Sequence, residues 1–358
     1  MKRFKAGLVR ALVLGVGMSV TSINAVAAER ITVNIGSSHP VQNIWVWAMK
    51  NVFQPEVDRL LEEQGGDYEI RWRENYGGTL YKFSETRKAV KDGIVDVGMI
   101  GTVWEESDLP LQNVTYYTPF ATDDHKLIIK IFDDLNRNLP ELRDSWYKEN
   151  LVPLSTLVTD SYDIYATSRI KTLDDLQNMR LNAPGTSANW LKGTGAIPVD
   201  GGLTTYYTNI QTGVTEGTLS FASGIGPARV HEVAPALTRV GFGSMAFGAV
   251  AVNKRFFDGL PEQVRSAFRE AGHIMSKRHG EHVAKTAKEW LTKMQDEGLE
   301  IHELPTAEKE RWVDNLPNLV GPWLKANGED AEVVLKAYFD KLRENGVEPL
   351  RAWDAAAR

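Results

Sequence analysis

Short β-rich runs alternate with longer helical stretches along the chain after Arg30, and this alternation restricts the possible folds more than any other feature. Residues 31–35 have the composition of a strand, whereas residues 45–61 carry apolar side chains at three- and four-residue steps, as an amphipathic helix does. The alternation favours an α/β architecture over an all-β sandwich. Further strands are expected at residues 68–72, 95–100, 155–167, 179–183, 217–222, 237–240 and 248–253. Further helices are expected at residues 84–91, 190–195, 206–213 and 227–233, with a short one opened by the capping pair Thr172 and Asp175.

A very long helical pattern covers residues 261–297. Pro261 suits the first position of a helix, and Glu262 follows it as helix N-termini prefer. Gly272 and Gly280 lie inside the pattern. Because each glycine costs about 1 kcal/mol relative to alanine, we expect a break or kink near one of them. A helix of this length is expected to bridge two lobes, and more helix is expected over residues 306–346.

The amino terminus has the pattern of a secretory signal peptide. Four basic residues precede an apolar run over residues 11–20, and small residues follow at Ala25, Ala27 and Ala28. The apolar run is shorter than the roughly 20 residues that a permanent membrane anchor needs. We therefore expect residues 1–28 to be a signal peptide, cleaved after Ala27 or Ala28, and the mature chain to reach the periplasm. About 330 residues would remain, which exceeds the usual size of a single core, so two lobes are expected.

The composition excludes several classes of function. The chain has 41 Lys and Arg against 47 Asp and Glu, and losing the four basic residues of the leader would leave 37 against 47. This acidic balance argues against nucleic-acid binding. Without any cysteine, the chain has no disulfide framework, no thiol nucleophile and no lipid-modified cysteine at a new amino terminus. Outside the leader no run of 18 apolar residues occurs, so no membrane span is expected.

Motifs for cofactors, metals and nucleophiles are absent or incomplete. Gly241, Gly243 and Ala246 fit the pattern GxGxxA, but strand-like residues follow them, whereas a dinucleotide site needs a helix there. Three histidines on the long helical pattern lack the glutamate arrangement of HExxH. No GxSxG motif is present to activate a serine. We therefore expect no cofactor, no metal and no catalytic residue, and we do not expect an enzyme.

Arg180 stands on a short apolar segment beside a turn. A guanidinium is always charged and presents a planar fork of donors, so where a fold holds it partly buried it pairs with a carboxylate or a phosphate. Two partners fit the sequence. One is the carboxylate of a bound solute, and the other is an acid of the chain itself, such as Asp174 or Asp175.

The residues around Arg180 form an ordered set of motifs. Asp175-Leu176 and Met179-Arg180 are followed by GAIPV over residues 195–199 and by YYTNIQTGVTEG over residues 206–217. In order and spacing they resemble the motifs DLxxxKxR, GAxPV and EVYxALQxGxVDGxEN of DctP-type solute receptors, which serve tripartite ATP-independent periplasmic (TRAP) transporters. The resemblance extends over most of the mature chain, through GIVDVGM at residues 93–99, Pro119-Phe120 with Asp123 and His125, Val252-Asn253-Lys254 and Leu260-Pro261.

This resemblance implies an α/β, two-lobe periplasmic binding protein fold with crossing strands and a long bridging helix. It implies that residues 29–153 and 246–280 form lobe I, that residues 154–245 and 281–340 form lobe II, and that residues 341–358 are a C-terminal tail. A receptor of this type captures an organic carboxylate as its lobes close and delivers it to a small and a large integral membrane permease subunit. We expect such a receptor to be a monomer.

The resemblance also implies a set of ligand-binding residues. By position, Arg180 matches the arginine that pairs with the ligand carboxylate, and Ser220 stands where the motif has asparagine. Glu216 replaces an aspartate, and the second arginine of sialic-acid receptors is missing near residues 160–162. These departures suggest a solute outside the common C4-dicarboxylates and sialic acid, and the aromatic side chains expected from the first lobe favour a bulky or ring-bearing carboxylate. The expected ligand-binding residues are Arg180, Ser220, Tyr162 and Asn182, together with His39, Tyr76, Tyr81, Glu85 and Trp104 from the first lobe.

Two other functions fit the same sequence. A ligand-sensing subunit that docks on a receptor kinase would share both fold and pocket. A periplasmic α/β enzyme is the other alternative, although the missing nucleophile, metal and nucleotide motifs argue against it.

Overall fold

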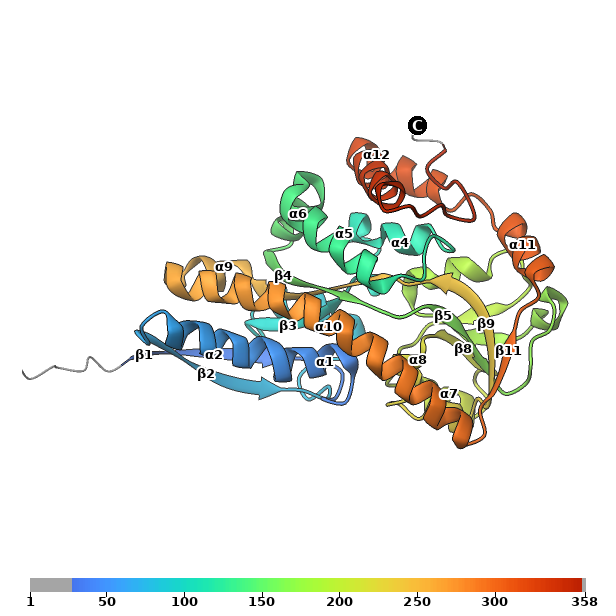
Figure 1. Cartoon of the computed structure of the whole chain (residues 1–358), viewed down its shortest axis with the longest axis horizontal. Helices are drawn as coiled ribbons and strands as arrows, with labels where there is room; N and C mark the ends of the chain where they lie inside the picture. Colours follow the sequence, from blue (N-terminus) through green and yellow to red (C-terminus); the bar gives the residue numbers. More distant parts are fainter. Residues whose placement is uncertain (1–27, 356–358) are drawn as a thin grey trace, which may run out of the picture.

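Two β-sheets form the framework of the protein (Figure 1). The structure is a computed structural model that describes residues 28–355, so the predicted signal peptide lies outside the described residues apart from Ala28. The first sheet, in the order β2-β1-β3-β10-β4, consists of β1 (Glu29–Gly36), β2 (Tyr68–Asn75), β3 (Val97–Gly101), β4 (Leu151–Val158) and β10 (Ala246–Asn253). The second, in the order β11-β9-β5-β8-β6-β7, consists of β5 (Tyr162–Ala166), β6 (Arg180–Asn182), β7 (Ile197–Val199), β8 (Gly217–Ser220), β9 (Ala236–Gly243) and β11 (Glu300–Glu303). The predicted α/β class is confirmed.

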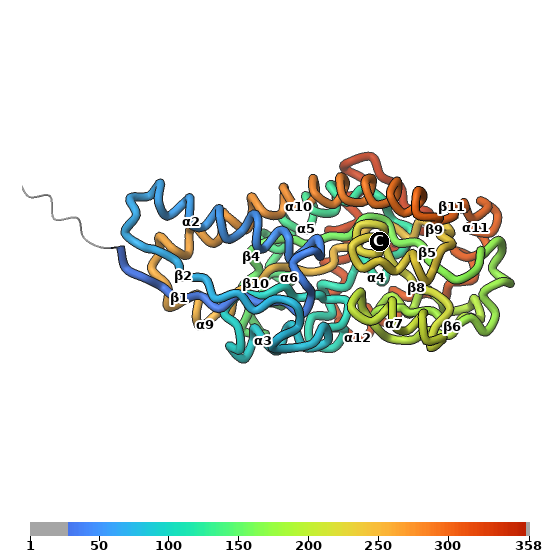
Figure 2. The backbone as a smooth tube through the Cα atoms, turned by 90° about the horizontal axis from the view of Figure 1, so that it is seen from below, coloured from blue at the N-terminus to red at the C-terminus, as the bar shows by residue number. Residues whose placement is uncertain are grey.

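Helices cover both sheets (Figures 1 and 2). The α-helices before β10 are α1 (Ile44–Ala48), α2 (Gln54–Glu63), α3 (Thr86–Lys91), α4 (Val114–Tyr117), α5 (His125–Asn138), α6 (Pro140–Lys148), α7 (Tyr206–Gln211) and α8 (Ala222–Ile225). Those after it are α9 (Lys254–Asp258), α10 (Glu262–Asp296), α11 (Thr306–Asn315) and α12 (Val320–Glu344). A π-helical turn, η1 (Met49–Phe53), joins α1 to α2, so the helix predicted over residues 45–61 is confirmed with a bulge inside it. The 3-10 helices are η2 (Phe83–Glu85), η3 (Thr102–Trp104), η4 (Pro110–Asn113), η5 (Leu173–Leu176), η6 (Gly185–Leu191) and η7 (Val230–Glu232).

The chain crosses between the two sheets at Thr159–Ser161, where a single strand was predicted over residues 155–167. That prediction is wrong, because β4 ends at Val158 in the first sheet and β5 begins at Tyr162 in the second. Between them, the Asp160 carboxylate accepts hydrogen bonds from the backbone N–H groups of Ala222 (2.9 Å) and Ser223 (3.3 Å). These bonds hold the crossover segment outside either ladder. A second crossing joins β9 to β10.

Helix α10 runs unbroken for 35 residues and contacts elements of both sheets (Figure 2). It packs on β4 and α2 near the first sheet and on α8 near the second, so the predicted bridging helix is confirmed. The break predicted near Gly272 or Gly280 does not occur. A Cβ atom at Gly272 would lie 2.1 Å from the carbonyl oxygen of Leu154. Glycine therefore serves close packing of the helix against β4 and not a kink.

The helix predicted over residues 190–195 is also wrong. Residues 190 and 191 instead end the 3-10 helix η6, which begins at Gly185. Gly193 and Gly195 follow with φ values of +81° and +80°, a conformation that an α-helix cannot contain. The chain then enters the edge strand β7.

One hydrophobic core extends from the first sheet into the second. The rings of Tyr116, Trp190, Phe242 and Trp312 follow one another with centroid separations of 5.7, 5.1 and 5.1 Å. Such offset and edge-to-face pairs add specific geometry to the burial of large apolar surface. The two sheets are therefore joined by packing as well as by chain crossings.

The C-terminal residues return to the body of the protein. Beyond α12, the backbone N–H of Leu350 donates to the carbonyl of Phe120 (3.2 Å), and the Trp353 indole donates to the carbonyl of Pro119 (2.8 Å). The predicted lobe border between residues 153 and 154 falls inside β4, whereas sheet membership would put it at the crossover Thr159–Ser161. The lobe boundaries stay a prediction. Within residues 28–355, no helix combines the length and apolarity that a bilayer span requires.

Candidate ligand-binding site

The ends of the parallel strands of the two sheets meet each other. β1 and β3 are parallel in the first sheet, as are β6 and β8 in the second. Val103 lies just beyond β3 and Gly185 just beyond β6, and a Cβ atom at Gly185 would lie only 2.0 Å from the Val103 carbonyl oxygen. The Thr186 hydroxyl donates to the same carbonyl (3.1 Å). We call this region, where the carboxyl ends of the strands face each other, the inter-sheet junction. In α/β proteins ligands bind at such strand ends.

His39 follows β1 at the junction and is almost fully buried, with 1% of its surface exposed. Its Nδ1 atom shares a hydrogen bond with the Ser38 hydroxyl (3.0 Å), while its Nε2 atom is buried without a partner. Burial lowers the pKa of His39 to about 4, so the imidazole is neutral near pH 7. A buried polar atom without a partner costs folding free energy, so the unpaired Nε2 calls for an explanation.

Aromatic rings surround His39. Trp104 stacks beside it at 6.5 Å, and Trp45 meets it edge-on at 5.7 Å. Trp45 in turn stacks on Phe247 at 3.6 Å and lies 5.8 Å from Phe221, which comes directly after β8. Rings of both sheets therefore meet at the junction, as suits the enclosure of an organic solute.

Trp104 spans the junction directly. Its indole N–H donates to the carbonyl of Gly201 at 3.4 Å, and its ring lies 5.1 Å from that of Phe83. A Cβ atom at Gly202 would lie 3.3 Å from Trp104 and 3.4 Å from Phe83. The loop after β7 thus closes over the aromatic side chains of the first sheet.

Ser220 and Asn182 end β8 and β6 at the junction, and the structure gives them different roles. The Ser220 hydroxyl is buried and has no hydrogen-bond partner. The Asn182 amide is fully engaged, because it donates to Thr215 (2.8 Å) and Gly217 (3.1 Å) and accepts from Asn209 (2.8 Å). The Ser220 hydroxyl is therefore unpaired, whereas Asn182 links the ends of β6 and β8.

Arg180 lies at the opposite end of β6 from the junction. Its Nε atom is 3.5 Å from the Glu216 carboxylate, which also accepts from the Arg180 backbone N–H (2.7 Å). Glu216 directly precedes β8, so both residues are at the amino ends of the parallel strands, about 7 Å of strand away from Asn182. The second partner open from the sequence, an acid of the chain itself, is therefore the one observed, but it is Glu216 and not Asp174 or Asp175.

The other predicted residues lie at varying distances from the junction. The Tyr76 hydroxyl donates to Gln54 (2.8 Å), and the Glu85 carboxylate accepts from the backbone N–H of Lys82 (3.1 Å) in the first turn of η2. Tyr81 is buried among apolar residues of the first sheet with an unpaired hydroxyl, and burial raises its pKa. Tyr162 packs in the core against Trp190 (5.2 Å) and Phe221 (5.1 Å).

Four aromatic residues of the junction were not predicted as ligand contacts: Trp45, Phe83, Phe221 and Phe247. Phe221 lies near the carboxyl end of the strand predicted over residues 217–222, and this position alone could have identified it. Trp45 and Phe247 reach the junction only through the pairing of β10 with β3 and the packing of α1, which the sequence does not reveal.

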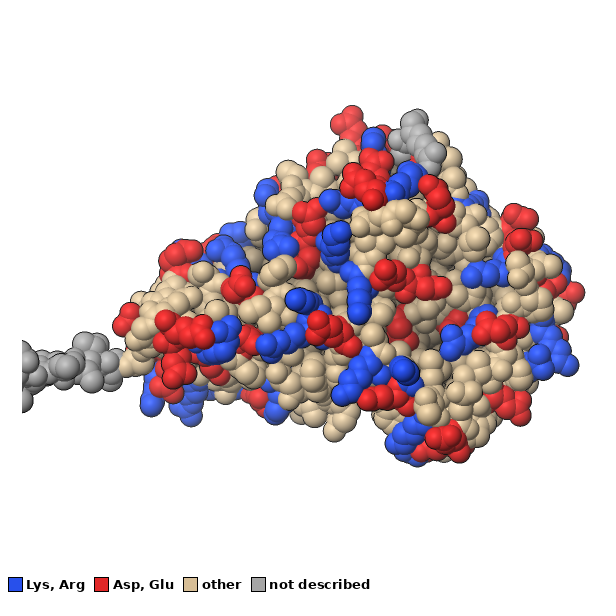
Figure 3. All heavy atoms as spheres, viewed as in Figure 1, with Lys and Arg blue, Asp and Glu red and all other residues tan. Residues whose placement is uncertain are grey.

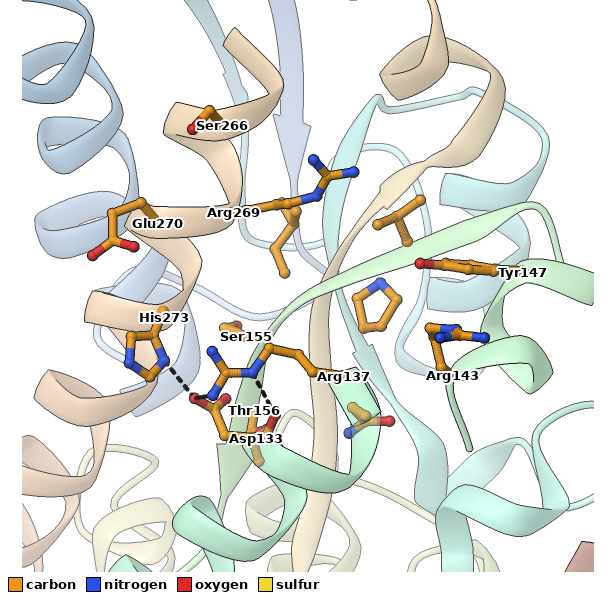
Figure 4. A pocket seen from close by; sticks show the side chains of 14 residues that line it. Asp133, Arg137, Arg143, Tyr147, Ser155, Thr156, Ser266, Arg269, Glu270 and His273 are labelled. Carbon is orange, nitrogen blue, oxygen red and sulfur yellow. Dashed lines mark hydrogen bonds and ion pairs between the residues drawn. The ribbon is translucent and has the colours of Figure 1, made fainter. Parts of the chain in front are cut away.

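A separate surface cavity of about 520 Å³ lies between α5, α6, the edge of β4 and α10 (Figure 4). Its Asp133 binds His273 (2.8 Å) and Arg137 (3.5 Å), and Arg143 lies beside Tyr147. None of the predicted ligand-binding residues lines this cavity. Acidic and basic side chains are interspersed over the face of the protein seen in Figure 3, which therefore offers no basic patch for nucleic acid. Among residues 28–355, no three or more potential metal-binding side chains gather at one point.

Comparison with known families identifies the fold. Residues 42–325 match the family model DctP, described as bacterial extracellular solute-binding protein, family 7. The chain belongs to this family. The predicted resemblance to DctP-type receptors is thereby confirmed, and with it the two-lobe α/β fold.

Individual members of the family are more distant. The C4-dicarboxylate-binding periplasmic protein DctP of Rhodobacter capsulatus is 30% identical over 161 residues, which are 44% of this chain and 48% of that protein. This match thus spans about half the length of the DctP relative. The ectoine-binding periplasmic protein TeaA of Halomonas elongata is 19% identical over 271 residues, which are 74% of this chain and 79% of TeaA.

Solved structures of TRAP solute receptors share the fold. DctP7 of Bordetella pertussis, a receptor that binds pyroglutamic acid, superposes with a TM-score of 0.76 at 21% identity, covering 86% of this chain and 99% of DctP7. A solute-binding protein of Rhodoferax ferrireducens with copurified benzoate also reaches 0.76, at 17% identity, covering 88% of this chain and 98% of its own. At these identities the likeness establishes the fold alone. The solute of the present protein has to be inferred from the residues of its inter-sheet junction.

Proposed function

We propose that this protein is the periplasmic solute-binding component of a TRAP-type transporter, which encloses a small, ring-bearing organic acid at the inter-sheet junction. The observation that carries the proposal is a pair of buried polar atoms without partners, His39 Nε2 and Ser220 Oγ, at the facing ends of β1 and β8. Buried polar groups are nearly always hydrogen-bonded in native proteins. A bound solute supplies the missing partners. The acids bound by the related receptors support the choice of solute class.

The proposed partners are the solute and two integral membrane permease subunits, one small and one large. The proposed location is the periplasm, reached by cleavage after Ala27 or Ala28, and the proposed state is a monomer. Within this proposal the receptor performs no chemistry on its solute. Arg180 is proposed to stabilise the β6–β8 pair through Glu216 and not to contact the solute.

The direct test uses purified mature protein, freed of copurified solute by unfolding and refolding. Thermal unfolding is measured with a panel of organic acids that includes pyroglutamate, benzoate, uronates and C4-dicarboxylates. At least one acid should raise the Tm in a concentration-dependent manner, because a ligand that binds only the folded state stabilises it. A panel without any effect would contradict the proposal, and recovery of a chemically altered solute would favour an enzyme.

The membrane partner of the protein distinguishes a transport receptor from the alternative, a sensing subunit. Copurification with membrane extracts should recover the permease subunits when solute is present. Capture of a receptor kinase in place of a permease would contradict the transport role while leaving solute binding intact.

A further inference from the structure

The charge of the inter-sheet junction is unusual for a site that would hold an acid. The side chains in contact there are neutral in the described structure: His39, Trp45, Phe83, Trp104, Ser220, Phe221 and Phe247. None of them is a lysine or an arginine. His39, the one residue of this set that could become a cation, is kept neutral by burial.

The nearby cations are engaged elsewhere. Arg180 pairs with Glu216 at the far end of β6. The guanidinium of Arg87, which approaches the residue after Trp104, is bound by Glu105 (2.6 Å), by Asp108 (2.6 Å) and by Glu149. Three carboxylates around one guanidinium leave it no free charge for a solute.

Lys82, directly before Phe83, is exposed and belongs to the turn that opens η2. Because it adjoins a ring of the junction in the sequence, its removal has to be tested as well.

Asp160, on the crossover between the sheets, also places no positive charge at the junction. The Asp160 carboxylate accepts from the backbone N–H groups of Ala222 and Ser223 and from the Ser223 hydroxyl (2.5 Å), directly after Phe221. It attracts no anion. Removing a carboxylate from water into surroundings without a positive charge is costly unless hydrogen bonds replace the lost hydration.

We infer that this receptor recognises its solute without an arginine–carboxylate ion pair, through the neutral groups of His39 and Ser220 and the surrounding aromatic rings. The inference rests on the proposed function and specifies the chemistry of its site. A solute's negative charge contributes little to affinity here, so uncharged analogues of the same shape bind almost as tightly as the acids.

The test is isothermal titration calorimetry with matched acid and amide pairs: pyroglutamate with its primary amide, and benzoate with benzamide. An arginine clamp would favour the acid on the order of 10- to 100-fold, because a hydrogen-bonded ion pair is lost in the amide. We expect the two members of a pair to bind within about threefold of each other. A preference of tenfold or more for the acid would overturn the inference while leaving the proposed function in place. Absence of binding by both members of every pair would overturn both.

Substitutions in the protein test the same inference, with the affinities for the acid and amide pairs as the readout. Arg180→Ala and Lys82→Ala should leave the affinity for either pair within about twofold, whereas Ser220→Ala should weaken acid and amide equally, by about tenfold. Circular dichroism melts of each variant control for folding. A tenfold loss confined to the acid in Arg180→Ala or Lys82→Ala would identify a cation clamp and contradict the inference.

Discussion

At Ser220, a substitution should change the solute affinity without lowering the free energy of unfolding. Its hydroxyl is buried and unpaired without a solute, so it costs desolvation free energy and returns no hydrogen bond. Ser220→Ala should therefore leave the free energy of unfolding unchanged or raise it by about 1 kcal/mol, while solute affinity falls. Urea unfolding and calorimetric titration of the same sample measure the two effects.

Ser223 provides the matched control for Ser220. Its hydroxyl donates to Asp160 at 2.5 Å, so Ser223→Ala should lower the free energy of unfolding by roughly 1–2 kcal/mol. A loss of stability in Ser220→Ala equal to that in Ser223→Ala would show that the Ser220 hydroxyl is structural.

Asp163 makes the stability of the protein depend on pH. Burial raises the pKa of this carboxyl to about 7, although it accepts hydrogen bonds from the backbone N–H groups of Val240 and Gly241 (2.8 Å each). Nearby Arg239 opposes the rise, and Asp123 adds to it. The folded state therefore binds a proton at a pH where the unfolded chain is still ionised, so stability should increase as pH falls from about 7 to about 4.

Asp163→Asn tests this dependence, since the amide can still accept both backbone hydrogen bonds. The variant should lose most of the increase between pH 7 and pH 4, an effect of a few kcal/mol in the free energy of unfolding. Asp160, whose pKa burial raises to about 6, contributes in the same direction and should preserve part of the slope. An unchanged pH profile in urea unfolding would contradict the role of Asp163.

Among the elements, α10 depends on one glycine for its position. Alanine at Gly272 would improve helix propensity by about 1 kcal/mol, but its Cβ atom would lie 2.1 Å from the backbone oxygen of Leu154. Backbone cannot move aside as a side chain can, so Gly272→Ala should lower the free energy of unfolding by roughly 2–3 kcal/mol. Equilibrium unfolding in urea measures the change.

Gly280 in the same helix is the control. A Cβ atom there would lie 2.7 Å from the end of the Ile129 side chain, which can rotate away. Gly280→Ala should therefore cost less than 1 kcal/mol or be neutral. Equal losses in both variants would show that the contact with β4 is not the reason for Gly272.

Elements defined by local chemistry could be predicted from the sequence, and those defined by pairing could not. The capping box of Thr172 and Asp175 was predicted and is confirmed, because its two partners are three residues apart. The partner of Arg180 is 36 residues away and is set by the alignment of β6 with β8, which has no local signature. The positions of β7 and β11, two short edge strands, are likewise fixed by pairing and were not predicted.

The site was predictable to the same extent. His39 and Trp104 were identified in loops after predicted strands, and Ser220 by its place in the family motif; the structure places all three at the junction. Whether Arg180 or another group receives the solute depends on which end of β6 faces the other sheet. Counted from Asp175, however, the motif DLxxxKxR puts its lysine at Arg180 and its arginine at Asn182, so the motif itself leaves the junction end of β6 without an arginine.

At the scale of the whole molecule, close approach of the two sheets depends on Gly185. Its φ of +44° and the 2.0 Å approach to the Val103 oxygen exclude a side chain, so Gly185→Ala should hold the strand ends apart. We expect at least tenfold weaker solute binding and an increased radius of gyration by X-ray scattering in the presence of solute. Gly213→Ala is the control, since Gly213 has a φ of +72° but no atom within contact distance. Equal losses of affinity in both variants would attribute the effect to backbone strain alone.

Helix α10 also determines how the protein comes apart. Its 35 residues span roughly 52 Å, with Gly272 against β4 of the first sheet and Trp290 against Gly226 near the second. Unfolding of either sheet would remove the packing contacts of one half of this helix. Thermal denaturation should therefore be a single cooperative transition in differential scanning calorimetry, with a van't Hoff enthalpy equal to the calorimetric one. If both sheets unfold in one transition, a solute bound at the junction stabilises the whole protein and not one sheet alone.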